Sequence, residues 1–131
     1  MAKILIIDDD DDLREMLVTV LEDEGFAALA AEDGVSGLRM FSAARPDVIV
    51  TDMIMPEANG LDTIREILSI DSQARIIAMS GGSLAGSDYY LIVAKTLGAM
   101  YVLPKPFEPD ELMQVIKTCL GSSPTRDASA A

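Results

Sequence analysis

Short runs of consecutive apolar residues alternate along the chain with longer stretches in which apolar residues recur at helical spacing. The first run, Ile4 to Ile7, holds four consecutive isoleucine or leucine residues, which suits a strand buried on both faces. Four more strands are predicted by the runs at 26–31, 48–50, 76–79 and 101–103. Because parallel strands joined through helices produce this alternation, the pattern predicts an α/β fold.

Helical patterns fill the stretches between these runs. The clearest places apolar residues at i, i+3, i+4, i+7 and i+8 from Leu13 to Leu21, and it ends at Gly25. Five strands and five helices together predict a flavodoxin-like, doubly wound, five-stranded parallel sheet with the strand order 2-1-3-4-5. The other four helical patterns lie at 35–41, 61–68, 89–97 and 112–120.

A chain of 131 residues suits one compact domain. We expect a single domain over residues 1–121, because the last helical pattern stops at Gly121. Residues 122–131 are small and polar, contain Pro124 and show no apolar period. This composition predicts a flexible C-terminal tail.

Composition removes several classes of function. The chain has no histidine, which excludes a Ser-His or Cys-His nucleophile and histidine-ligated metal sites. Its net charge of -12 disfavours binding to nucleic acid or to an anionic membrane, since both would repel it. No apolar stretch approaches the ~18 residues of a membrane span, and no signal-peptide core is present. We therefore expect a cytoplasmic protein whose chemistry uses carboxylates, lysine, hydroxyl groups or a bound ion.

Polar side chains follow four of the predicted strands. Asp8 and Asp9 come directly after the first strand, Asp52 after the third, Ser80 after the fourth and Lys105 after the fifth. In a parallel α/β sheet, ligands bind outside the carboxyl ends of the strands. If the first and third strands are neighbours, the three carboxylates meet Lys105 at one edge of the sheet.

Crowded carboxylates need positive charge among them. Two unit charges ~4 Å apart near a protein surface repel by about 4 kcal/mol. Lys105 supplies one positive charge, and Mg²⁺, which prefers oxygen ligands and retains several waters, suits the rest. Such a site fits phosphoryl transfer to a carboxylate, with Asp52 as the expected nucleophile and the adjacent pair Asp8 and Asp9 as metal ligands.

These residues carry a family resemblance. The segments Ile4-Leu5-Ile6-Ile7-Asp8-Asp9, Asp52-Met53-Ile54-Met55-Pro56 with Gly60, Ser80, and Lys105-Pro106-Phe107 occur in this order. Together they resemble the receiver domain of two-component response regulators, over residues 3 to 120. The resemblance implies a stand-alone, chemotaxis-type single-domain receiver, which catalyses only its own phosphorylation and dephosphorylation.

The resemblance also implies roles for individual residues. Asp52 matches the phosphorylated aspartate, and Asp8, Asp9, Asp52 and the backbone carbonyl of Ile54 match the Mg²⁺ ligands. Ser80 and Lys105 match the hydroxyl and the ammonium group that meet the phosphoryl group. The implied partners are a sensor histidine kinase or a histidine phosphotransfer protein and an unknown downstream protein, with the receiver a monomer or a weak phosphorylation-dependent dimer.

One position of this chain departs from the family pattern, and another is expected to affect how fast the phosphoryl group is lost. Val102 stands three residues before Lys105, where the family usually has the aromatic residue that switches together with the hydroxyl of Ser80. Tyr101 lies one position earlier, and since strand side chains alternate between faces it is not expected to replace that aromatic. Ile54, two residues beyond Asp52, predicts slower loss of phosphate than in an Ile54→Asn variant, because an apolar side chain restricts water there.

Two other functions compete with the receiver. One is a small Mg²⁺-dependent phosphatase of the haloacid-dehalogenase kind, whose motif D-x-D-x-[TV] follows the first strand; here Asp12 stands where threonine or valine belongs. The other is an interaction module that keeps the receiver fold without phosphorylation, which only Val102 favours.

Overall fold

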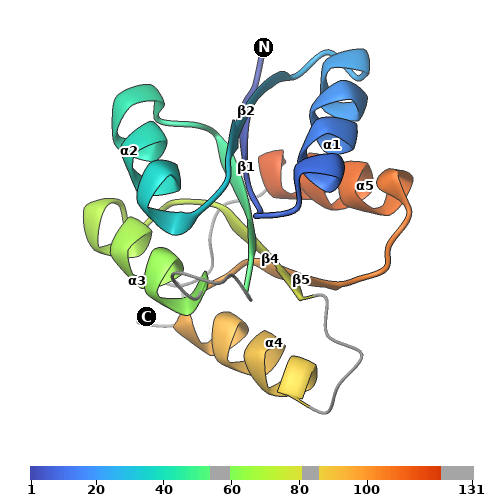
Figure 1. Ribbon diagram of the computed structural model, residues 1–131. Coiled ribbons are helices and arrows are strands. Elements are labelled where there is room, and N and C mark those ends of the chain that lie inside the picture. The colour runs from blue at the N-terminus through green and yellow to red at the C-terminus, as the bar shows by residue number, and fades with distance from the viewer. Residues whose placement is uncertain (54–59, 81–85, 122–131) are drawn as a thin grey trace.

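The computed structural model describes residues 1–53, 60–80 and 86–121, which form a sheet with helices on both sides (Figure 1). Its strands alternate with its helices along the chain, as the apolar pattern predicts. The elements are β1 (Lys3–Ile7), α1 (Asp11–Asp23), β2 (Ala27–Ala31), α2 (Gly34–Ala44), β3 (Val48–Asp52), α3 (Gly60–Ile70), β4 (Ile76–Ser80), α4 (Gly86–Leu97), β5 (Tyr101–Pro104) and α5 (Pro109–Leu120).

The sheet has five parallel strands in the order β2-β1-β3-β4-β5. This confirms the predicted α/β, flavodoxin-like, doubly wound fold with the strand order 2-1-3-4-5. The central strand, β3, pairs with β1 through Ile7 and Thr51 and with β4 through Asp52 and Met79. The carboxyl ends of β1, β3 and β4 therefore lie side by side.

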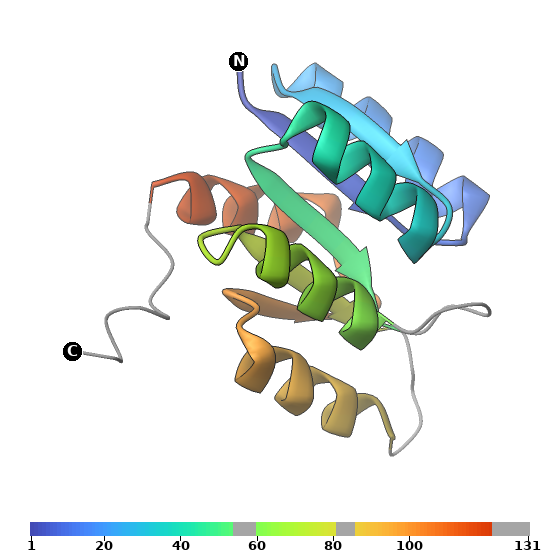
Figure 2. The same cartoon turned by 90° about the vertical axis from the view of Figure 1, so that its left-hand side faces the viewer.

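Helices cover both faces of the sheet. Helices α2, α3 and α4 pack on one face, and α1 and α5 pack on the other (Figures 1 and 2). Within β1, Leu5 and Ile7 point into the core beneath α2, α3 and α4. Ile4 and Ile6 point into the core beneath α1 and α5. All four side chains are fully buried, which explains why this strand reads as an unbroken apolar run.

Some element ends differ from the sequence prediction. Helix α4 begins at Gly86, before the expected start at residue 89. An apolar period does not detect this first helical turn, because it begins with the glycine and polar residues Gly86, Ser87 and Asp88. Strand β2 begins at Ala27, one residue after Phe26, within the usual uncertainty of a strand end.

The expected tail, 122–131, lies outside the described residues. Within residues 1–53, 60–80 and 86–121, no helix combines the length and the apolar content that crossing a bilayer requires.

Gly37 in α2 offers a test of how tightly this helix packs on the sheet. A Cβ atom at Gly37 would lie 2.5 Å from Cδ1 and 2.9 Å from Cγ1 of the fully buried Ile7. Alanine improves helix propensity by about 1 kcal/mol, but overpacking a core costs about 1–3 kcal/mol. We expect Gly37→Ala to lower the free energy of unfolding in urea by about 1 kcal/mol, because the β-branched Ile7 cannot move aside.

The double variant Gly37→Ala/Ile7→Val separates this clash from other causes. Valine lacks Cδ1, so the two substitutions together are expected to cost less than the sum of their separate costs. Strict additivity in the urea denaturation would contradict the packing described here.

Cys119 gives a second test of the core. It is fully buried on the α1 and α5 side of the sheet, and this burial raises the pKa of its thiol to about 11. The folded protein is expected to resist iodoacetamide at pH 8, and to react once urea unfolds it, because the thiolate is the reactive form. Rapid labelling of the folded protein would contradict this account.

The raised pKa of Cys119 also makes stability depend on pH. Because the pKa of the thiol is higher in the folded state, the contribution of Cys119 to stability is present below pH ~8.5 and is lost as the pH rises toward 11.

Candidate functional site

The carboxyl ends of β1 and β3 bring three carboxylates together. Oxygen atoms of Asp8, Asp9 and Asp52 all lie within 4.8 Å of one another. Asp8 is fully buried and Asp52 is 5% exposed, whereas Asp9 lies at the surface. Because Ile7 pairs with Thr51 in the sheet, the residues that follow them are neighbours. The structure thus places all three predicted acidic residues in one cluster.

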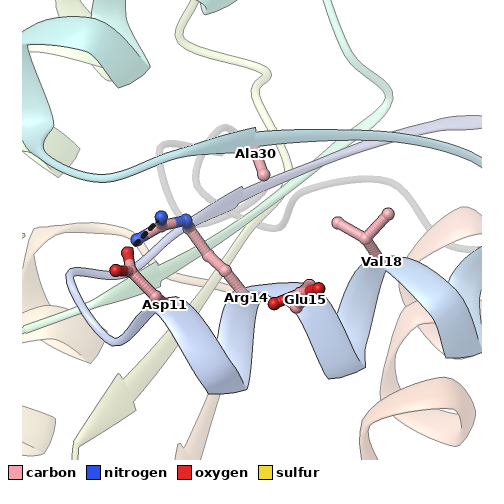
Figure 3. A pocket seen from close by; sticks show the side chains of 5 residues that line it. All are labelled: Asp11, Arg14, Glu15, Val18 and Ala30. Atoms are coloured by element: carbon pink, nitrogen blue, oxygen red, sulfur yellow. Dashed lines mark hydrogen bonds and ion pairs between the residues drawn. The ribbon is translucent and has the colours of Figure 1, made fainter.

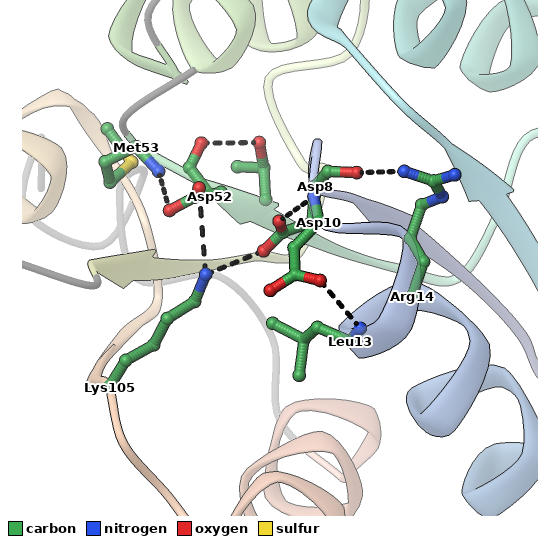
Figure 4. A network of polar contacts seen from close by, with 8 residues as sticks. Asp8, Asp10, Leu13, Arg14, Asp52, Met53 and Lys105 are labelled. Atoms are coloured by element: carbon green, nitrogen blue, oxygen red, sulfur yellow. Dashed lines mark hydrogen bonds and ion pairs between the residues drawn. The ribbon is translucent and has the colours of Figure 1, made fainter. Parts of the chain in front are cut away.

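Lys105 joins this cluster from the segment after β5 (Figure 4). Its Nζ lies 2.8 Å from Oδ2 of Asp8 and 3.7 Å from Oδ2 of Asp52. The backbone N–H of Lys105 also donates to the carbonyl oxygen of Ser80 at 2.8 Å, which ties the segment to the end of β4. One ammonium group therefore serves two buried carboxylates, and it is closer to Asp8.

Asp52 ends the central strand with its carboxylate held in place. The backbone N–H of Met53 donates to Oδ1 of Asp52 at 2.9 Å, and Oδ2 faces Lys105. The hydroxyl of Thr51 donates to the backbone carbonyl of Asp52 at 3.1 Å. The contacts to Met53 and Lys105 fix the carboxylate, and the contact from Thr51 fixes the backbone beside it.

Asp8 is held at every polar atom. Its backbone N–H donates to the carbonyl of Ala31, and its Oδ1 accepts from the backbone N–H of Asp10 at 2.8 Å. Nη1 of Arg14 donates to its backbone carbonyl at 2.8 Å, and Lys105 contacts its Oδ2. The turn between β1 and α1 is thus tied down on several sides.

Ser80 ends β4 with its side chain buried. The residue is 1% exposed, and its Oγ makes no hydrogen bond within the described part of the chain. Leaving such a group unsatisfied costs about 1–3 kcal/mol, so exceptions of this kind often mark functional positions. An acceptor that arrives beside Ser80 would satisfy it.

Tyr101 and Val102 lie on opposite faces of β5. Val102 packs against the core of α2, α3 and α4, and it pairs with Ala78, two residues before Ser80 on β4. Tyr101 packs against the other core, and Nζ of Lys95 lies 5.6 Å from the centre of its ring. Tyr101 therefore does not occupy the face of the sheet that Ser80 and Val102 share.

The donor atoms fit a hard divalent cation. Three carboxylates and one ammonium leave two negative charges at the site, which one divalent ion neutralises. Carboxylate oxygens are the ligands that Mg²⁺ prefers, and the exposure of Asp9 leaves room for retained waters. The fourth expected ligand, the carbonyl of Ile54, lies outside the described residues.

One contact of the site escapes sequence reasoning. Arg14 is not among the predicted site residues, although its guanidinium reaches the backbone of Asp8. Its only sequence signal is that it is the first cation after the run of five aspartates, Asp8 to Asp12.

Comparison with family models identifies the family of this domain. The family model described as the response regulator receiver domain matches residues 4–117. The chain belongs to this family. The predicted family, and the fold that it implies, are therefore confirmed.

Curated relatives and solved structures agree with the assignment. The chain is 35% identical to chemotaxis protein CheY of Bacillus subtilis over 90% of this chain and 97% of that protein. It is 34% identical to the CpxR homolog of Haemophilus influenzae, a transcriptional regulatory protein, over 98% of this chain but only 56% of that protein. A receiver domain protein from Clostridium thermocellum superposes with a TM-score of 0.86 at 33% identity, over 92% of this chain and 95% of that one. The chain thus spans nearly all of some relatives and about half of others.

Lys105 provides the test of this geometry. We expect Lys105→Met to lower the free energy of unfolding by on the order of 2 kcal/mol in the presence of a chelator, because Asp8 and Asp52 lose their shared cation. This is less than for a fully buried pair, since a fifth of the Lys105 side chain is exposed. Urea denaturation measures the loss, and adding Asp8→Asn is expected to restore most of it.

Lys117→Met is the matched control. Lys117 pairs with Glu24 at 3.0 Å on the surface, so its loss is expected to cost about 0.5 kcal/mol. Equal losses for Lys105 and Lys117 would show that Lys105 does not neutralise buried charge.

Proposed function

We propose that this receiver domain accepts a phosphoryl group on Asp52, in an Mg²⁺-dependent reaction, from a sensor histidine kinase or a histidine phosphotransfer protein. Receiver domains are signalling modules that work with such donors and with downstream targets. The observation that carries the proposal is the position of Asp52: a nearly buried carboxylate that ends the central strand beside Lys105 and two further carboxylates.

The contacts of Asp52 suit a nucleophile. Its Oδ1 accepts from the backbone N–H of Met53, and its Oδ2 lies 3.7 Å from Nζ of Lys105. In the proposed step, a carboxylate oxygen of Asp52 forms a bond to phosphorus, and the bond from phosphorus to the donor breaks, with its electron pair leaving on the donor. Lys105 neutralises charge on the phosphoryl oxygens through this step.

Asp8, Asp9 and Asp52 would hold the metal, together with the proposed carbonyl of Ile54. When bound, Mg²⁺ supplies positive charge that offsets the repulsion between an incoming phosphate and these carboxylates. Asp8 is held at its backbone and at Oδ1, so little of this ligand has to be ordered on binding.

The proposed response begins with charge. A phosphoryl group on Asp52 adds negative charge and acceptor oxygens beside Lys105, which in the described state lies nearer to Asp8. The unsatisfied hydroxyl of Ser80 is a donor for those oxygens. We propose that the Lys105 ammonium and the Ser80 hydroxyl move toward Asp52 and that the surface of α4, β5 and α5 changes with them. Val102, and not Tyr101, lies on the same face of the sheet as Ser80, so Val102 is the residue of β5 that would respond.

We propose a cytoplasmic receiver domain over residues 1–121, which binds neither nucleic acid nor membrane and is a monomer or a weak phosphorylation-dependent dimer. The match to nearly the whole of the Bacillus subtilis CheY supports this, and the net charge of -12 supports the absence of nucleic acid. The family match weighs against a small-molecule phosphatase.

Phosphorylation by a small donor tests the function. Incubation with Mg²⁺ and acetyl phosphate is expected to add the mass of one phosphoryl group to the wild type, as measured by intact mass spectrometry. Asp52→Asn is expected to take up none, because an amide is a poor nucleophile. A chelator is expected to prevent the adduct on the wild type.

Asp23→Asn is the control, since Asp23 is an exposed carboxylate at the end of α1, and it should behave as the wild type does. An unmodified wild type, or an adduct on Asp52→Asn equal to that on the wild type, would contradict the proposal.

A further inference from the structure

Arg14 contacts the candidate site through the backbone of Asp8 and does not contact the carboxylate of that residue. It lies in the first turns of α1, and its guanidinium reaches the backbone of the turn that carries Asp8 and Asp9 (Figure 4). We propose that Arg14 is a positioning residue, which sets the β1–α1 turn so that Asp8 and Asp9 present their carboxylates to the divalent cation. This inference rests on the proposed Mg²⁺ site.

Two contacts on one rigid plane carry the proposal. Nη1 of Arg14 donates to the backbone carbonyl of Asp8 at 2.8 Å, and Nη2 pairs with the carboxylate of Asp11. The planar guanidinium therefore joins the turn to the start of α1 in one fixed geometry. Only 18% of the Arg14 side chain is exposed, whereas Asp11 is 79% exposed, so the contact to the Asp8 carbonyl is the sheltered one.

The carbonyl of Asp8 is a sensitive point of the turn. It belongs to the peptide group that links Asp8 to Asp9, so its direction determines how the following residue leaves the strand. Asp9 is exposed, and no hydrogen bond or ion pair to its carboxylate is found in the described ranges. The backbone is therefore the means by which the protein directs Asp9, and Arg14 is the side chain that holds this peptide group.

Charge and geometry predict opposite effects of losing Arg14. A positive charge near a cation site weakens cation binding, so removal of Arg14 would strengthen binding if charge alone mattered. If Arg14 positions the turn, its removal weakens binding, because residues that orient metal ligands typically contribute about 10- to 100-fold in affinity. The sign of the change therefore separates the two explanations.

Space beside Arg14 makes the substitutions practicable. The side chain borders an open groove of about 450 Å³ between α1 and β2, shared with Asp11, Glu15, Val18 and Ala30 (Figure 3). Lysine or methionine at this position does not enter a packed core. Changes in metal affinity can thus be measured on folded variants.

The experiment measures Mg²⁺ affinity by isothermal titration calorimetry for the wild type, Arg14→Lys and Arg14→Met, alongside free energies of unfolding in chelator. Arg14→Lys retains the charge but not the two-pronged contact, and it is expected to bind Mg²⁺ about tenfold more weakly. Arg14→Met is also expected to bind more weakly, despite the lost positive charge. The same two substitutions at Arg39, an exposed arginine of α2, are the control and should leave the affinity unchanged.

Each outcome decides the matter. Unchanged affinity in Arg14→Lys, or tighter binding in Arg14→Met, would overturn the positioning role while leaving the proposed function intact. A loss of affinity in the Arg39 variants equal to that at Arg14 would overturn it as well. Absence of Mg²⁺ binding by the wild type would overturn both the proposed metal site and the role of Arg14.

Discussion

Mutual repulsion between the carboxylates at the ends of β1 and β3 is the constraint on which the rest of the site depends. Asp8 and Asp52 are buried, and their oxygens lie within 4.8 Å of each other and of Asp9. Such an arrangement is unfavourable unless positive charge accompanies it. Lys105 supplies a single positive charge against three carboxylates. The proposed cation would offset the negative charge that remains.

The sheet makes this crowding possible. Strands β1, β3 and β4 are buried on both faces, so their apolar side chains hold the strands in register and leave the polar residues at their ends no freedom to separate. Backbone N–H groups of Asp10 and Met53 then fix one oxygen of each buried carboxylate. The free energy gained by burying the two cores thus sustains a charged cluster that would disperse in an open chain.

Much of the fold was predictable because strands buried on both faces consist of consecutive apolar residues, which can be recognised in the sequence. The run Ile4 to Ile7 is apolar throughout since it faces two cores, and the aspartates that follow it stand where the strand must end. The start of α4 at Gly86 was not predictable from apolar period, because the first turn of that helix has none.

The contacts within the site were less accessible to sequence reasoning. Strand order brings Lys105 to the acidic edge, but side-chain geometry decides that its Nζ lies nearer to Asp8 than to Asp52. The hold of Arg14 on the Asp8 carbonyl is a side-chain to backbone contact, and such contacts leave no motif. The opposite faces of Tyr101 and Val102, in contrast, followed from strand alternation alone.

The most direct test of the central claim is to locate the cation. Crystals grown with Mn²⁺, an ion that takes the same oxygen ligands as Mg²⁺, can be measured by anomalous diffraction. The account predicts one strong anomalous peak in contact with the carboxylates of Asp8, Asp9 and Asp52. An anomalous map with no peak at these carboxylates, at saturating Mn²⁺, would contradict it.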